Sequence, residues 1–224
     1  WARIAGRCYV KRRRSPPSGA KRKFWPLPCR VTMHLPVCAM PCSAWRCWLE
    51  AMLLFAYGSL LNPESAERAL HRSFTGADLI TAELPDYALC WTSIHRIAVE
   101  GVGELAASFL NLRPQAGARA LGALLVIDAA EFARLCAREK GYSVHHVQCR
   151  TETGQWLSAV TFVDERPTPR IFPPAPRAYL SKIEAGLKQL PASFATAYRA
   201  ALPEPAGWVA GNYGFVDPEQ KSHT

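Results

Sequence analysis

The sequence lacks several features that would point directly to a class of protein. Its 224 residues contain no apolar run near the ~18–20 residues that a membrane-spanning helix requires. They also contain no C-x-x-C pair, no glycine-rich phosphate loop, no dinucleotide-binding fingerprint opening a helix and no G-x-S-x-G elbow. These absences argue against a helical membrane protein, a zinc ribbon, a nucleotide-binding enzyme of the common motifs and an α/β-hydrolase.

Acidic residues are scarce in the first 51 positions. Eleven Lys/Arg and a single acid, Glu50, fall there, whereas residues 52–224 carry sixteen bases and seventeen acids. The formal net charge of +9 therefore belongs to the N-terminal segment. We expect no general basic patch, and no nucleic-acid partner, for residues 52–224.

Cysteine is also sparse after residue 51, where three of the eight cysteines fall. Cys90, Cys136 and Cys149 are widely spaced among apolar residues, a pattern typical of buried thiols in a reducing compartment. Because no membrane-spanning run is present either, we expect a cytoplasmic protein with no membrane partner.

Residues 1–51 admit four interpretations. The basic runs at 11–14 and 21–23 suit a nuclear signal or a nucleic-acid-binding tail, and the Arg-rich, acid-poor composition suits a transit peptide. A zinc site would use Cys38, Cys42, Cys47 and His34. The segment would otherwise be translated upstream sequence, because the chain opens on Trp1 and this stretch is rich in Arg, Pro, Cys and Trp. We expect the last case, with Met52 as the start and residues 1–51 disordered.

Residues 52–224 alternate short apolar strands with amphipathic helices. Strands are expected at 53–57, 87–94, 105–112, 121–127, 144–150 and 156–163, with turn signals at 113–118 and 152–155. Helices are expected at 63–72, 129–140, 177–190 and 192–201. Asn62 and Pro63 cap the first helix, and Asp128 with Glu131 caps the second. The pattern predicts an α+β domain built on a curved sheet or small barrel.

The stretch Tyr57-Gly58-Ser59-Leu60 lies between a buried strand and a helix. Gly58 allows a sharp turn, and the N–H groups that follow can point at an anion close to a helix N-terminus. The same four residues also suit an ordinary strand–helix turn. Ser59 has no nearby His/Asp pattern, so we do not expect it to act as a nucleophile.

Glu139 falls at helical spacing on the same face as three apolar residues, Phe132, Leu135 and Cys136. An exposed structural glutamate would lie on the opposite face, where we place Arg138. A carboxyl group in apolar surroundings is suited to proton transfer near neutral pH. The alternative is a last-turn glutamate that reaches solvent as the helix frays.

Two further candidates are weaker. Tyr179 begins the 177–190 helix, where its spacing to Ile183 suits packing, although a phenol that faces a pocket also fits. The adjacent His145 and His146 point to opposite faces of a strand, so both cannot easily bind one metal ion. We expect a structural role for this pair, and no metal site.

Three stretches taken together resemble the gamma-glutamylcyclotransferase family: "FAYGSLLNP", "ALGALLVIDAAEFARLCAREKGY" and "FPPAPRAYLSKIEAGLKQLPASFATAY". Family members have a strand that ends in Y-G-S-x-L, a later helix that closes with E-G or R-E-x-G-Y, and a C-terminal P-S-x-x-Y helix. The three motifs occur in the same order here, from about residue 53 to residue 198.

The resemblance implies a small mixed β-barrel with flanking helices over residues 52–224. It implies that Glu139 is the catalytic acid/base and that the substrate is bound by Tyr57, Gly58, Ser59, Leu60 and Tyr179. The implied activity converts a gamma-glutamyl amine or gamma-glutamyl amino acid to 5-oxoproline and a free amine, without a cofactor. The expected partner is thus a small gamma-glutamyl molecule.

Two other functions remain open. A domain of this fold could bind a small molecule without turnover, or transfer an acyl group, because a fold does not fix a reaction. The basic N-terminal segment could instead make the chain a nucleic-acid-associated protein, whose salt-dependent binding would be lost on deleting residues 1–51.

Overall fold

A computed structural model of the protein describes residues 51–139 and 141–217. The interpretations of the N-terminal segment fall on residues 1–50 and lie outside the described range. No helix within that range is long and apolar enough to span a membrane.

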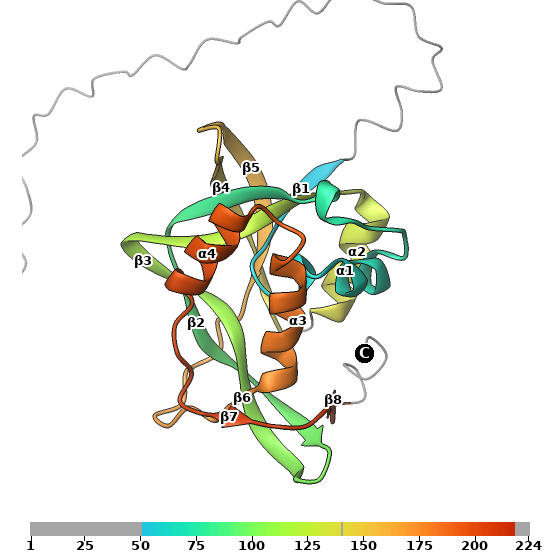
Figure 1. The fold of residues 1–224 in the computed structure, drawn as a ribbon, viewed down its shortest axis with the longest axis vertical. Coiled ribbons are helices and arrows are strands. Elements are labelled where there is room, and N and C mark those ends of the chain that lie inside the picture. Colours follow the sequence, from blue (N-terminus) through green and yellow to red (C-terminus); the bar gives the residue numbers. More distant parts are fainter. Residues whose placement is uncertain (1–50, 140, 218–224) are drawn as a thin grey trace, which may run out of the picture. The chain divides into compact units, whose positions relative to one another are not determined.

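Five strands close into a barrel (Figure 1). They are β1 (Met52–Ala56), β2 (Ile80–Val99), β3 (Gly103–Ile127), β4 (Ser143–Thr151) and β5 (Trp156–Val163). Their order is β3-β1-β5-β4-β2, and pairing of β2 with β3 completes the ring. The sheet is mixed, because β1 pairs in parallel with β5 while its other ring pairings are antiparallel. This confirms the barrel that the family resemblance implied.

Three short strands were not predicted from the sequence. β8 (Tyr213–Phe215) adds to the edge of β2, and β6 (Ala175–Pro176) forms a separate parallel pair with β7 (Trp208–Val209). Strands of two or three residues carry too little alternation to be recognised from sequence. β8 matters for function, because it brings aromatic side chains near the C-terminal end of the described chain back to the barrel.

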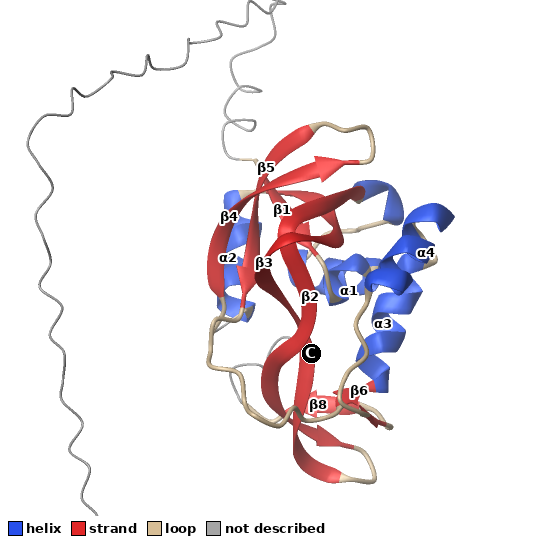
Figure 2. Ribbon diagram, turned by 90° about the vertical axis from the view of Figure 1, so that its left-hand side faces the viewer, coloured by secondary structure: helices blue, strands red, loops and turns tan. Residues whose placement is uncertain are grey.

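Four α-helices flank the barrel: α1 (Pro63–Leu70), α2 (Ala129–Arg138), α3 (Arg177–Leu187) and α4 (Ala192–Ala201). Asn62 caps α1 by accepting from the Glu64 N–H at 2.9 Å, and the capping box between Asp128 and Glu131 is present in α2. Both caps were expected from sequence. Figure 2 shows α1, α3 and α4 along the same side of the strands. Two short 3₁₀ turns, Ser59–Leu61 and Gly76–Asp78, complete the part of the fold that the structure describes.

The hairpin of β2 and β3 corrects two of the predicted strands. We expected a turn at 113–118 between separate strands, yet β3 runs without interruption from Gly103 to Ile127. The predicted turn residues form an irregularity within the hairpin instead, at the point where the pairing register of β2 and β3 shifts between Pro85 and Tyr87. Asp86, with a positive φ of 59°, accepts a hydrogen bond from the Gly117 N–H at 2.8 Å. A local Pro/Gly cluster therefore bends a long strand here instead of ending it.

Candidate functional site

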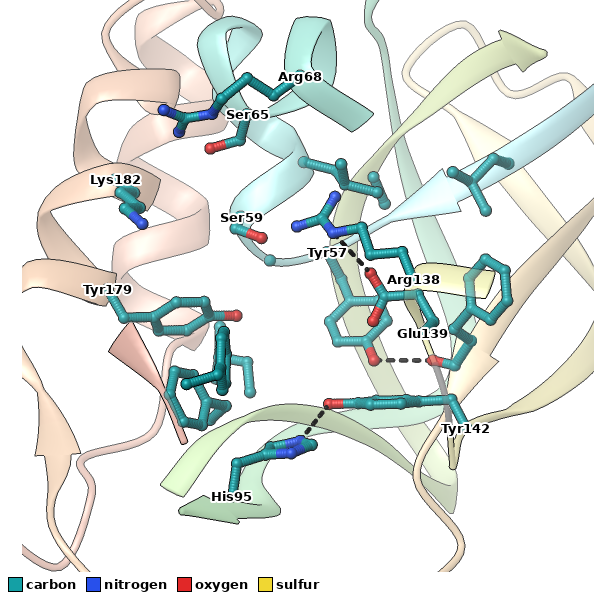
Figure 3. A pocket seen from close by; sticks show the side chains of 18 of the residues that line it. Tyr57, Ser59, Ser65, Arg68, His95, Arg138, Glu139, Tyr142, Tyr179 and Lys182 are labelled. Atoms are coloured by element: carbon teal, nitrogen blue, oxygen red, sulfur yellow. Dashed lines mark hydrogen bonds and ion pairs between the residues drawn. The ribbon is translucent and has the colours of Figure 1, made fainter. Parts of the chain in front are cut away.

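A cavity of about 150 Å³ opens where β1 gives way to α1 (Figure 3). All six residues that the sequence analysis assigned to the site line it: Tyr57, Gly58, Ser59, Leu60, Glu139 and Tyr179. They come from the loop after β1, the end of α2 and the first turn of α3. Segments far apart in the sequence thus meet at a single hollow.

The loop after β1 is fixed from both sides. The Tyr57 hydroxyl donates to the Phe162 carbonyl at 2.8 Å, and the Tyr57 carbonyl accepts from the fully buried Tyr198 hydroxyl at 2.5 Å. Farther on, the Asn62 amide donates to the Lys182 carbonyl of α3 at 3.0 Å. The phenol of Tyr57 is therefore committed to the barrel, and the loop offers a ligand mainly its backbone and the Ser59 side chain.

Gly58 lies directly against Tyr179. A Cβ atom at position 58 would fall 2.6 Å from the Tyr179 hydroxyl oxygen, inside any permitted contact. The Tyr179 ring is held in turn by edge-to-face contacts with Trp91 and Phe109, at centroid distances of 6.1 and 5.0 Å. The glycine is needed so that the tyrosine hydroxyl can approach the loop.

Glu139 faces the cavity from the end of α2. The helix ends at Arg138, two residues before the predicted end at residue 140, and Glu139 is its C-cap. Its N–H still donates to the Leu135 carbonyl at 2.8 Å, so its side chain keeps the direction of the helical face. The side chain is 22% exposed and has not turned out to solvent. The expected inward carboxylate is present.

Arg138 was wrongly placed on the solvent face. Its side chain lines the cavity, with Nε 3.5 Å from Glu139 Oε1. Its Nη1 atom is buried and has no hydrogen-bond partner within the described ranges. A long side chain at the last position of a helix can follow the neighbouring carboxylate, which helical periodicity does not capture.

Positive charge exceeds negative charge in the cavity. Arg68 from α1 and Lys182 from α3 join Arg138, against the single carboxylate of Glu139. Burial, and then the charges of Arg68 and Arg138, lower the pKa of Lys182. A ligand that carries carboxylates would relieve this repulsion.

Two lining residues, Tyr142 and His95, were not predicted. Gly141, with a φ of +85°, turns the chain after Glu139, and the Tyr142 N–H donates to the Glu139 carbonyl at 3.1 Å. The turn places the Tyr142 ring 6.0 Å from that of His95 in a stacked arrangement. Burial, and next the charge of Glu139, raise the pKa of Tyr142. The sequence signal for Tyr142 was its place directly after the helix end that carries Glu139.

Asp164 anchors a polar cluster behind this wall. Burial opposes ionisation of Asp164, but hydrogen bonds from Arg166 and Ser93 outweigh it and lower the pKa of the carboxyl group. Asn111 holds the Asp164 backbone through bonds of 2.8 and 2.9 Å to its carbonyl and N–H. Asp164 is thus an ionised, almost fully buried acceptor.

The loss of stability caused by the Asp164→Asn substitution should be largest near neutral pH. A lowered folded-state pKa contributes stability above the unfolded value of about 3.9, and that contribution disappears as pH falls through the folded value. The difference in free energy of unfolding between wild type and D164N, measured with urea, should therefore be largest at pH 6–8 and shrink below about pH 4. A difference that stays constant from pH 7 to pH 3 would contradict this expectation.

The remaining candidates have structural surroundings. His145 lies 3.4 Å from the Tyr87 hydroxyl and 3.0 Å from Glu165, which agrees with a structural role. The three cysteines of the described range are free, and only Cys149 is fully buried. No group of three or more His, Cys, Asp or Glu that could hold a metal ion occurs in residues 51–139 and 141–217.

Comparison with known proteins gives a match at the level of structure. No family model and no curated protein matches the sequence. The structure is similar to that of a gamma-glutamyl cyclotransferase, with a TM-score of 0.54 and 18% identity, covering 69% of this chain and 90% of that one. It is also similar to an uncharacterized human protein, with a TM-score of 0.56 and 20% identity, covering 77% and 97% of the two chains. The described part of the chain therefore has the fold of a gamma-glutamyl cyclotransferase.

Proposed function

We propose that this protein is a cyclotransferase that converts a gamma-glutamyl amine or gamma-glutamyl amino acid to 5-oxoproline and a free amine. The observation that carries the proposal is Glu139, a carboxylate at the wall of a cavity whose other charged side chains are cations and whose lining is rich in aromatic residues. The fold shared with a gamma-glutamyl cyclotransferase supports it. The reaction has one substrate, and each of its steps requires a proton transfer that one carboxylate can perform.

The first step closes the ring. The Glu139 carboxylate takes a proton from the substrate α-ammonium, and the freed amine attacks the γ-carbonyl carbon of the same molecule. A carbon–nitrogen bond forms, and the carbonyl oxygen becomes an oxyanion. Intramolecular attack gives a high effective concentration, so the cavity must mainly fold the substrate and keep it in place.

The second step releases the amine. Protonated Glu139 gives its proton to the nitrogen of the departing amine, the original carbon–nitrogen bond breaks, and the carbonyl of 5-oxoproline re-forms. The ring nitrogen still carries two hydrogens at this point, so the regenerated Glu139 carboxylate takes one of them and passes it to the released amine, which leaves as an ammonium ion. Glu139 returns to the carboxylate, and protons and charge balance over the cycle. The developing oxyanion can be stabilised by N–H groups of the loop after Gly58 or by the Tyr179 hydroxyl.

The cations suit the carboxylates of such a substrate. Every gamma-glutamyl compound has an α-carboxylate, and a gamma-glutamyl amino acid has another on its leaving group. Arg138 is adjacent to Glu139, whereas Arg68 and Lys182 project from α1 and α3 beyond Ser59 (Figure 3). An arginine guanidinium binds a carboxylate with two hydrogen bonds, which would fix the glutamyl end beside the base.

The proposal is tested by incubating the protein with gamma-glutamyl-alanine, glutathione and gamma-glutamyl-ethylamide and measuring 5-oxoproline by liquid chromatography. We expect product from at least one of them. Binding of these compounds by calorimetry with no product from any would contradict turnover, and it would favour a domain that binds without catalysis.

The Ser59→Ala variant should keep most of the activity. Ser59 belongs to the cavity wall, but the contribution of the loop is expected to be mainly its backbone. We expect KM to rise by less than about 10-fold and kcat to change little, as for loss of one neutral hydrogen bond of about 1 kcal/mol. A loss of kcat by several orders of magnitude would instead make Ser59 a participant in the chemistry.

A further inference from the structure

A chain of buried polar groups ends at the Tyr142 hydroxyl. Ser93 Oγ lies 2.8 Å from Asp164 Oδ2, 2.9 Å from His95 Nε2 and 2.5 Å from the Tyr142 oxygen. Ser93 is fully buried, and Asp164 and His95 are 7% and 9% exposed. The reaction as written above gives no role to this chain, although it runs directly behind the wall that carries Glu139.

The direction of every proton in the chain follows from Asp164. A carboxylate paired with Arg166 at 2.8 Å can only accept hydrogen bonds, so Ser93 must donate its single proton to Asp164. Ser93 Oγ then has only lone pairs left for its other two neighbours. Each of these two contacts therefore needs a proton from the neighbour, so Tyr142 must donate its hydroxyl proton to Ser93 and His95 must present Nε2 as N–H. The same His95 N–H lies 3.3 Å from the Tyr142 oxygen, which can only accept from it.

The consequence is a hydroxyl whose proton points away from the cavity. Tyr142 lines the cavity, and with its proton committed to Ser93 its oxygen faces a ligand as an acceptor. Tyr57 behaves similarly, because its proton is committed to the Phe162 carbonyl. Neither of these two phenols therefore donates to Glu139, which keeps the carboxylate available as a base.

The Tyr179 hydroxyl, in contrast, can act as a hydrogen-bond donor in the cavity. No hydrogen bond from its hydroxyl occurs within the part of the chain that the structure describes, and the hydroxyl lies against Gly58 at the cavity wall. It is free to donate to a substrate oxygen. The cavity thus separates an acceptor phenol near Glu139 from a donor phenol near the loop (Figure 3).

We propose that Tyr142 accepts a hydrogen bond from the substrate α-ammonium, and that Ser93 and Asp164 are positioning residues that hold the Tyr142 proton away from the cavity. This inference rests on the proposed function. An ammonium group has three N–H bonds, of which one is directed at Glu139 and a second at Tyr142. When Glu139 removes its proton, the bond to Tyr142 remains and keeps the nitrogen lone pair aimed at the γ-carbonyl.

The first test is a double-mutant cycle on gamma-glutamyl-alanine. Tyr142→Phe removes the acceptor, and kcat/KM should fall roughly 10- to 100-fold, as for loss of a hydrogen bond to a charged group. Ser93→Ala frees the Tyr142 proton and should cause a fall in the same direction. Because Ser93 acts through Tyr142, S93A should have less than about a 2-fold further effect in the Y142F background.

The second test asks whether the ammonium is the group that is recognised. Glutaryl-alanine is gamma-glutamyl-alanine without its α-amino group, so it cannot cyclise and serves as a competitive inhibitor. Its inhibition constant should change less than about 2-fold in Y142F and S93A. Tyr87→Phe removes a hydroxyl that contacts His145 outside the cavity, and it serves as the matched control with unchanged kinetics.

The outcomes separate this inference from the proposed function. Wild-type turnover with independent, multiplying effects of S93A and Y142F would overturn the inference alone, as would equal weakening of substrate and glutaryl-alanine. Should S93A fail to fold, Y142F alone still tests the inference, because only the substrate, and not glutaryl-alanine, carries the ammonium that Tyr142 is proposed to bind. Absence of 5-oxoproline from every substrate with the wild-type protein would reject the proposed function and this inference with it.

Discussion

The Glu139→Gln variant is expected to form 5-oxoproline at least about 10³-fold more slowly than the wild-type protein. One general acid–base transfer contributes roughly 10²–10⁴-fold, and Glu139 is proposed to act in both ring closure and amine release. Glutamine keeps the shape and the hydrogen-bonding capacity of the side chain but cannot exchange the proton. The loss should therefore appear in kcat, measured as 5-oxoproline released from gamma-glutamyl-alanine under saturating substrate.

The control for this variant is Glu104→Gln. Glu104 forms an exposed ion pair with Arg96 on the β2–β3 hairpin and does not line the cavity, so E104Q should retain wild-type kinetics. The melting temperature of E139Q should lie within a few degrees of wild type, because Glu139 is partly exposed and its ion pair with Arg138 spans 3.5 Å. An E139Q protein that is folded and fully active would refute the acid/base assignment.

Local patterns were sufficient for the parts of the site that lie within one element. The turn at Gly58 was visible because a buried apolar strand stops at a glycine just before a capped helix. Glu139 was visible because helical spacing puts it beside Leu135, which is fully buried in the structure. In both places the sequence periodicity, the helix cap and the tertiary packing specify the same local structure, so the sequence pattern alone is sufficient to predict it.

Contacts between distant elements could not be predicted in this way. Ser93 and Asp164 are 71 residues apart, and only the closure of the barrel brings them together. The same holds for Phe215, which reaches the cavity on a three-residue strand whose pairing with β2 has no periodic signal. The inward turn of Arg138 depends on where α2 ends, a boundary that local patterns place only within a few residues.

The Gly58→Ala variant is expected to lose activity about 10²-fold and stability by about 1–3 kcal/mol. The new methyl group would lie 2.6 Å from the Tyr179 hydroxyl oxygen, so either the loop or the tyrosine ring must move. Trp91 and Phe109 pack against the ring in edge-to-face contacts, which makes its displacement costly. Urea unfolding and 5-oxoproline formation measure the two losses separately. Gly207→Ala is the matched control, because a methyl group there would meet an ordinary contact at 3.9 Å and should leave both quantities unchanged.

A second substitution can separate the steric from the chemical contribution of this contact. The double variant G58A/Y179F lacks the oxygen that the methyl group strikes, so it should recover most of the lost stability. It should not recover activity, because the phenol proposed to donate to the substrate is absent. Recovery of both would mean that Tyr179 only fills space beside the loop. Recovery of neither would place the strain of G58A in the loop backbone, because removing the Tyr179 hydroxyl leaves the turn from Tyr57 to Leu60 unchanged.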